Sequence, residues 1–184
     1  MSLTYSEMLP IGTTAPDFNL FDPVSGKNLN LNALKSNKAT VIMFICNHCP
    51  YVKHIQTELV NVANQYLTKG IHFIAVNSNN ADLYPADSPE EMKKTAEALH
   101  YPFPYLYDET QSVARAYQAA CTPDFYVFDQ DLHCVYRGRF DDATPGNQVP
   151  VTGKDLSDAL DALLTGKPIN PDQKPSMGCN IKWR

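Results

Sequence analysis

Cys46 and Cys49, separated by two residues, are the side chains in this sequence best suited to carry out a reaction. A Cys-x-x-Cys pair typically performs thiol–disulfide exchange or binds a metal ion. A strand pattern ends at Cys46 and a helical pattern begins at Pro50, so the Cys46 sulfur lies near the positive end of a helix dipole. That position favours the thiolate, which is the form that attacks disulfides. We therefore predict that Cys46 is the nucleophile and that Cys49 resolves the mixed disulfide.

His48 adds a titratable group between the two sulfurs. As an imidazolium it would favour the thiolate and hence the reduced protein, which predicts an oxidising potential. A copper or zinc module is the alternative, with Cys46, Cys49, His48 and either Cys121 or Cys179 as ligands, because thiolate and imidazole suit these ions. No second Cys-x-x-Cys or paired histidines follow at zinc-finger spacing. Redox chemistry without a cofactor is therefore the preferred interpretation.

Three further cysteines differ in their surroundings. Cys121 precedes Pro123 by two residues and is expected near the pair, either with a redox role or as a small buried core residue. Cys179 follows Gly178 in a proline-rich tail, where it is either an extra resolving thiol, within one chain or across a homodimer, or an idle tail residue. Cys134 falls inside a strand pattern, which predicts a core position.

The elements that position these residues alternate between strands and helices. Ala39–Ile45 is β-branched and apolar throughout, as in a central strand covered on both faces. Apolar residues then recur at helical spacing from Pro50 to Lys69, and Gly70 ends that helix. The remaining predicted elements are a strand at 71–76, a helix from the Ser88 cap to about Leu99, a strand at 103–107, a short helix at 111–117, a hairpin of strands 125–128 and 135–139, and a helix at 154–164. This order is the thioredoxin arrangement, a βαβ unit followed by a ββα unit.

Size and charge limit the classes of partner. The 184 residues suffice for one domain, expected over residues 1–165 with its core from residue 10, followed by an extended tail at 166–184 that prolines interrupt. The net charge of -5 and the short apolar run at Val41–Cys46 argue against nucleic-acid and membrane partners. The segment Met1–Met8 lacks the features of a secretory signal, which predicts a cytoplasmic protein.

Several segments resemble a known family. Residues 12–20, Gly-Thr-Thr-Ala-Pro-Asp-Phe-Asn-Leu, are similar to the opening of peroxiredoxins and periplasmic-type thioredoxin-like proteins. Four further segments, at 46–52, 121–125, 137–142 and 178–183, together resemble the peroxiredoxin-like, AhpC/TSA-type subgroup of the thioredoxin superfamily. The resemblance covers nearly the whole chain. It implies an α/β thioredoxin fold with an N-terminal β extension and a central mixed sheet flanked by helices.

The resemblance also implies roles for single residues. Pro123 would form a cis peptide bond facing the cysteine pair, and Thr122 would offer its backbone to an extended peptide as an added strand. The implied activity is thiol–disulfide exchange with protein or small-molecule disulfides and dithiols. Thioredoxins carry a buried carboxylate where this chain has Thr40, so proton transfer must use another group. Peroxiredoxins align their peroxide-attacking cysteine with Cys49, so an antioxidant peroxidase acting on peroxides is the alternative.

Overall fold

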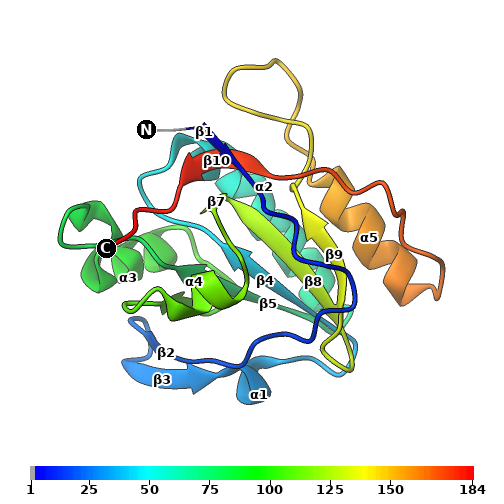
Figure 1. Ribbon diagram of the computed structural model, residues 1–184, viewed down its shortest axis with the longest axis horizontal. Helices are drawn as coiled ribbons and strands as arrows, with labels where there is room; N and C mark the ends of the chain where they lie inside the picture. Colours follow the sequence, from blue (N-terminus) through cyan, green and yellow to red (C-terminus); the bar gives the residue numbers. More distant parts are fainter. Residues whose placement is uncertain (1–2) are drawn as a thin grey trace.

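The strand that leads to Cys46 lies at the centre of the structure, a computed structural model that describes residues 3–184 (Figure 1). This strand, β4 (Ala39–Phe44), is buried at every position. It pairs in parallel with β5 (Ile71–Asn77) and antiparallel with β8 (Asp124–Asp129). Apolar character on both faces thus marks a central strand of a mixed sheet, as the sequence predicts.

In the described part of the chain, seven strands form this main sheet in the order β3-β2-β6-β5-β4-β8-β9. Its other strands are β2 (Asn19–Asp22), β3 (Lys27–Asn30), β6 (Tyr105–Tyr107) and β9 (Cys134–Gly138). β8 and β9 pair antiparallel as the predicted hairpin, and β2 pairs antiparallel with β3 at the opposite edge. The second hairpin is the N-terminal β extension that the resemblance implies.

Helices cover both faces of the main sheet. Alternate residues of β4 point to opposite faces, so each face contributes to its own core. Val41 and Met43 belong to one core, with residues of α2, α3 and α5, whereas Ile42 and Phe44 belong to the other, with residues of α1 and α4. The helices are α1 (Leu31–Leu34), α2 (Pro50–Leu67), α3 (Pro89–Ala98), α4 (Ser112–Ala116) and α5 (Lys154–Leu164), with a 3₁₀ turn, η1 (Pro85–Asp87). Within residues 3–184, no helix is both long and apolar enough to span a bilayer.

α2 starts directly after the cysteine pair. Cys49 is its N-cap residue, and Pro50 occupies the first turn, where the missing N–H costs nothing because that group has no helical partner. At the other end Gly70 has a φ of +85°, a conformation that glycine adopts without strain. The buried face repeats at helical spacing and consists of Val52, Ile55, Leu59, Val62, Ala63 and Tyr66. Burial of this face fixes the start of the helix, and with it Cys49, against the sheet.

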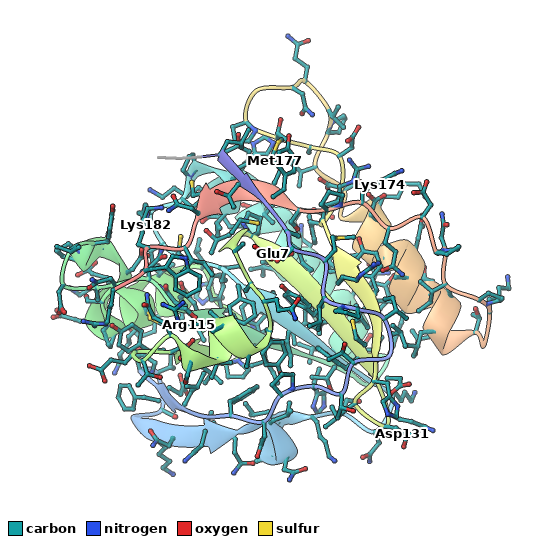
Figure 2. All side chains as sticks on the ribbon, in the orientation of Figure 1. Glu7, Arg115, Asp131, Lys174, Met177 and Lys182 are labelled. Atoms are coloured by element: carbon teal, nitrogen blue, oxygen red, sulfur yellow. The ribbon has the colours of Figure 1, made fainter. Side chains whose placement is uncertain are left out.

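A second sheet, which has three strands within residues 3–184, contains a strand of the C-terminal tail. β10 (Met177–Asn180) lies between β1 (Leu3–Tyr5) and β7 (Cys121–Thr122), antiparallel to both. Figure 1 shows β10 crossing the molecule near α2, and Figure 2 labels Met177 and Lys182 along this final segment. The division of the chain at residue 165 stays a prediction, but part of the tail is a paired strand, not merely an extended segment.

Candidate active site

The Cys46–Cys49 pair occupies the junction between β4 and α2. Cys46 follows the last residues of β4, and Cys49 caps α2 with an extended backbone, φ −68° and ψ 123°. Cys46 is 2% exposed and Cys49 is 0% exposed. Because both sulfurs are excluded from solvent, a reagent reaches them only if it is small or if a neighbouring segment moves.

Thr122 and Pro123 face the pair, and the predicted cis bond between them is confirmed. The Thr122 hydroxyl lies 3.3 Å from the Cys46 Sγ, and the Cys49 Sγ lies 3.3 Å from the Thr122 carbonyl oxygen. The backbone of Thr122, however, already pairs with Cys179 of β10. In this conformation the protein's own tail is the extended strand that pairs with Thr122, so the expected pairing of Thr122 with a substrate peptide stays a prediction.

Cys179 lies against Cys49, with their Sγ atoms 2.8 Å apart. The register of β10 opposite Thr122 brings this sulfur to the pair, and Cys179 is 3% exposed. Gly178 permits the close approach, because a Cβ there would lie 2.0 Å from the Thr122 carbonyl oxygen. Of the two predicted additional site cysteines, Cys179 is therefore the one whose sulfur touches the pair.

Cys121 and Cys134 have different surroundings. The Cys121 thiol is fully buried and points to the Pro123 carbonyl at 3.9 Å. Burial and the nearby Asp124 carboxylate raise the pKa of Cys121 far above its usual range, which keeps it protonated. Cys134 packs in the core formed with α1 and α4, so its predicted core position is confirmed. The geometry of Cys121 is that of the core residue considered in the sequence analysis.

The two cysteines of the pair differ in acidity. A hydrogen bond with Cys46 lowers the pKa of Cys49 to about 5, and the Cys179 thiol and nearby backbone N–H groups act in the same direction against burial. The same hydrogen bond, burial and the Asp87 carboxylate raise the pKa of Cys46 well above its usual range. These directions favour the thiolate on Cys49 over Cys46, whereas the sequence predicts Cys46 as the nucleophile, and that assignment stays a prediction.

Asp87 is the site residue that sequence reasoning missed. It ends η1 fully buried, and its carboxylate pairs with the Nδ1 of His48. The Asn47 backbone N–H donates to Asp87 at 2.7 Å and the Asn79 side chain donates at 2.8 Å. These contacts outweigh burial and lower the pKa of Asp87. The one signal for Asp87 in the sequence was its place directly before the Ser88 helix cap. An aspartate at such a position is common in loops, so it did not indicate a role in the site.

His48 therefore does not act on the sulfurs as an isolated cation. Its ring stacks on Tyr84, with centroids 5.2 Å apart, and its Nδ1 faces the buried carboxylate of Asp87. Its Nε2 is buried and has no hydrogen-bond partner within residues 3–184. With hydrogen on Nδ1, Nε2 keeps a lone pair and is free to accept a proton. The predicted influence of His48 on the thiols is opposed by the negative charge of Asp87.

Comparison with known proteins identifies the family. The model of the AhpC/TSA family matches residues 11–137. The chain belongs to the AhpC/TSA family. Comparison with curated proteins gave no match. The predicted membership of the peroxiredoxin-like part of the thioredoxin superfamily is confirmed.

Solved structures agree with this membership. An uncharacterized conserved protein from Geobacillus kaustophilus is 61% identical over 100% of this chain and 97% of its own, with a TM-score of 0.99. A hypothetical protein from Sinorhizobium meliloti is 45% identical over 98% of both chains, with a TM-score of 0.95. The thioredoxin domain of a thiol-disulfide oxidoreductase from Bacteroides vulgatus is 18% identical over 81% of this chain and 96% of its own, with a TM-score of 0.62. The last likeness confirms the thioredoxin fold of this AhpC/TSA protein.

One group of side chains in the described part of this AhpC/TSA protein has ligand atoms close enough to share a metal ion. It consists of Cys46, His48 and Asp87, with the relevant atoms within 4.8 Å of one another. Sulfur, imidazole and carboxylate donors are all used by zinc. The Asp87 oxygens, however, already accept hydrogen bonds from the Asn47 N–H and the Asn79 side chain. Carboxylates that ligate metal ions commonly accept such hydrogen bonds as well, so the metal-binding alternative stays a prediction.

A surface cavity of about 390 Å³ adjoins the site of the AhpC/TSA protein. Its walls include Tyr51 and Ile55 of α2, Met177 of β10, and Pro123, which follows β7. None of the three clustered sulfurs belongs to the residues that line it. The cavity therefore borders the cis peptide bond without opening onto the thiols.

Proposed function

We propose that this AhpC/TSA protein is a thiol–disulfide oxidoreductase that cycles Cys46 and Cys49 between dithiol and disulfide. The observation that carries the proposal is the hydrogen-bonded pair itself, with its thiolate at the start of α2 and Thr122 beside both sulfurs. Such a pair supplies both a nucleophile and a neighbouring thiol that completes the exchange. The substrates are disulfides and dithiols.

The acidities set the order of the steps. The Cys49 thiolate attacks a substrate disulfide, forms a mixed disulfide and releases one substrate sulfur as a thiolate. Cys46 then loses its proton and attacks the Cys49 sulfur, which forms the Cys46–Cys49 disulfide and releases the second substrate thiolate. The two substrate thiolates take up protons. The His48 ring, one nitrogen of which lies within 4.8 Å of the Cys46 sulfur, is a candidate acceptor for the Cys46 proton.

Equilibration with glutathione tests the proposal. In Cys179→Ser protein, which leaves Cys46 and Cys49 as the two thiols of the site, we expect both to lose reactivity with an alkylating agent together as oxidised glutathione increases, with a disulfide between them in the peptide map. Cys46→Ser and Cys49→Ser should each abolish this disulfide. Cys134→Ser removes a buried thiol from the core that packs against α1 and α4, away from the site. This variant is the matched control and should retain the Cys46–Cys49 disulfide. A wild-type pair that stays fully alkylatable in oxidised glutathione would refute the proposal.

Peroxide reduction is a second candidate, favoured by one observation. The Cys49 thiolate is fully buried between two other thiols, so a small oxidant suits it better than a protein disulfide. The thiolate would attack a peroxide oxygen to form a sulfenic acid and release an alcohol or water, and a neighbouring thiol would then form a disulfide and release water. Stoichiometric hydrogen peroxide added to a protein with Cys46 and Cys179 both changed to serine should yield a sulfenic acid on Cys49. Absence of this product, with Cys49 still alkylatable, would exclude the second candidate.

A further inference from the structure

Cys49 has a sulfur neighbour on each side. The Cys46 thiol shares a hydrogen bond with it, and the Cys179 Sγ lies 2.8 Å away on β10. A disulfide is about 2.05 Å long, so the Cys49 and Cys179 sulfurs need to approach by less than about 1 Å to bond. Cys49 can therefore form a disulfide with either neighbour, but with one at a time.

We propose that Cys179 is a third redox thiol of the active site, which moves the disulfide from Cys46–Cys49 to Cys49–Cys179. This inference rests on the proposed function, because the exchange starts from the Cys46–Cys49 disulfide. It deepens that function by adding a catalytic residue from the far end of the sequence. The protein then holds a disulfide while Cys46 is again a free thiol.

The exchange is balanced within the chain. The Cys179 sulfur attacks the Cys49 sulfur, the Cys49–Cys179 bond forms, and the Cys46–Cys49 bond breaks with Cys46 leaving as a thiolate. The proton of the Cys179 thiol ends on Cys46. One disulfide and one thiol are present before and after the step, so no external oxidant or reductant is consumed.

The state of Cys49 controls how readily Cys179 reacts. In the reduced protein, burial and the neighbouring Cys49 raise the pKa of Cys179 to about 12, while Lys182 acts in the opposite direction. Oxidation to Cys46–Cys49 removes the negative charge of Cys49, and with it one of the causes that keep Cys179 protonated. Cys179 is thus more easily ionised when there is a disulfide for it to attack.

The tail is fixed to the same network that holds the pair. The Lys182 N–H donates to the Asn79 side chain at 2.8 Å, and the other end of that amide donates to Asp87. The Lys182 carbonyl accepts hydrogen bonds from the Asn80 N–H at 2.9 Å and the Gln111 side chain at 2.8 Å. These contacts hold Cys179 at Cys49 instead of leaving it to diffuse on a loose tail.

Oxidation of the Cys46→Ser protein with one equivalent of diamide tests the third thiol. We expect loss of alkylation at both Cys49 and Cys179, and a peptide map that links these two residues within one chain. Cys121 is the matched control, since it is a buried cysteine on β7 beside the same strand. The Cys46→Ser protein that also carries Cys121→Ser should give the same link. Cys179 still alkylatable after Cys49 is oxidised would overturn the proposal.

The exchange itself is measured in the wild-type protein. Oxidised protein is equilibrated, quenched with acid, alkylated and mapped, and the single free thiol of the cluster should be found on both Cys179 and Cys46. A free thiol confined to Cys179 would overturn the exchange while leaving the proposed function intact. If Cys179→Ser protein, in which the exchange is impossible, forms no Cys46–Cys49 disulfide, the proposed function itself fails. The two failures are therefore distinguishable by peptide mapping of the two proteins.

Discussion

The two segments that meet at Cys49 are built in different ways. Residues 46–50 join β4 to α2, and neighbours in the sequence determine most of their geometry. Residues 177–182 take their geometry from distant segments, namely β1, β7, Asn79 and Gln111. The first segment supplies a pair of thiols to any protein that contains the motif. The second brings a third sulfur only if the whole fold closes around it, so its chemistry depends on the integrity of the tail.

The largest effect is expected from Gly178→Ala, which separates the two segments. The new Cβ would lie 2.0 Å from the Thr122 carbonyl oxygen and 2.8 Å from its carbon, and these backbone atoms cannot move independently. We expect β10 to shift from β7, with a loss of stability of about 1–3 kcal/mol and loss of the Cys49–Cys179 link after oxidation. Denaturant unfolding and the peptide map measure both effects.

Gly146→Ala is the matched control for that substitution. A Cβ at Gly146 meets no atom within 4 Å, so this variant should unfold and cross-link as the wild type does. If Gly178→Ala retains the Cys49–Cys179 link at wild-type yield, the close pairing of β10 with Thr122 is not what positions the third sulfur.

The same contrast explains what could be predicted from the sequence. α5 was predicted with its observed bounds, and β4 and α2 within two residues, because their apolar periodicity and terminal glycine or proline are local signals. The cis bond at Pro123 followed from a family motif. β10 has four residues, including a glycine, and gains its strand geometry from two partners distant in sequence. Asp87 likewise acquires its role only when η1 packs against residues 46–50, where its carboxylate accepts a hydrogen bond from the Asn47 N–H.

A pH series separates the acid–base chemistry of the pair from the packing of the tail. The pKa of Cys49 falls from 9.0 to about 5 in the folded reduced protein, so ionisation of Cys49 stabilises that fold. The gain is absent below about pH 5, grows as the pH rises, and is complete above about pH 9. The oxidised protein lacks a Cys49 thiol. We therefore expect the stability of the reduced form, relative to the oxidised form, to rise across this window by at most about 1.4 kcal/mol per pH unit.

Denaturant unfolding of both redox forms measures this difference. The comparison cancels groups that titrate in both forms, such as Asp124, whose pKa burial raises to about 7. Cys49→Ser protein cannot form the disulfide, so its stability is compared with that of the reduced wild type, in which Asp124 also titrates. The difference between these two proteins should grow over the same pH window. A constant difference would assign the pH dependence to another group.

Asp87→Asn weakens the contacts by which η1 holds residues 46–50 in place. The substitution removes the charge that the His48 ring and the Asn79 side chain contact, and hydrogen bonds to a charged group contribute about 1.5–3 kcal/mol each. We expect a loss of stability of about 2 kcal/mol. Since Asp87 raises the pKa of Cys46, the same change should lower that pKa. In a Cys49→Ser background, the alkylation of Cys46 should then begin at a lower pH.

Asp131→Asn serves as the control for Asp87→Asn, because Asp131 is exposed in the distant β8–β9 turn (Figure 2). It should change neither the stability beyond about 0.5 kcal/mol nor the Cys46 profile. An unchanged Cys46 profile in the Asp87→Asn protein would show that the carboxylate positions the loop without acting on the sulfur.

The smallest effect is expected from His48→Ala, which removes the ring partner of the Asp87 carboxylate while leaving both segments in place. Without the imidazole, the buried Asp87 carboxylate keeps its contacts with the Asn47 N–H and the Asn79 side chain but loses its ring partner. The potential at the pair becomes more negative, the thiolate is less stable, and the equilibrium with glutathione shifts toward the protein disulfide. Cys49 takes its low pKa mainly from the Cys46 hydrogen bond and not from His48, so we expect the equilibrium constant with glutathione to change by less than about tenfold, the factor that one pKa unit represents.

The control is His54→Ala, which removes an exposed histidine on α2 and should leave the equilibrium constant unchanged. A shift toward the dithiol in His48→Ala would mean that the imidazole destabilises the thiolate, contrary to the charge arrangement described above.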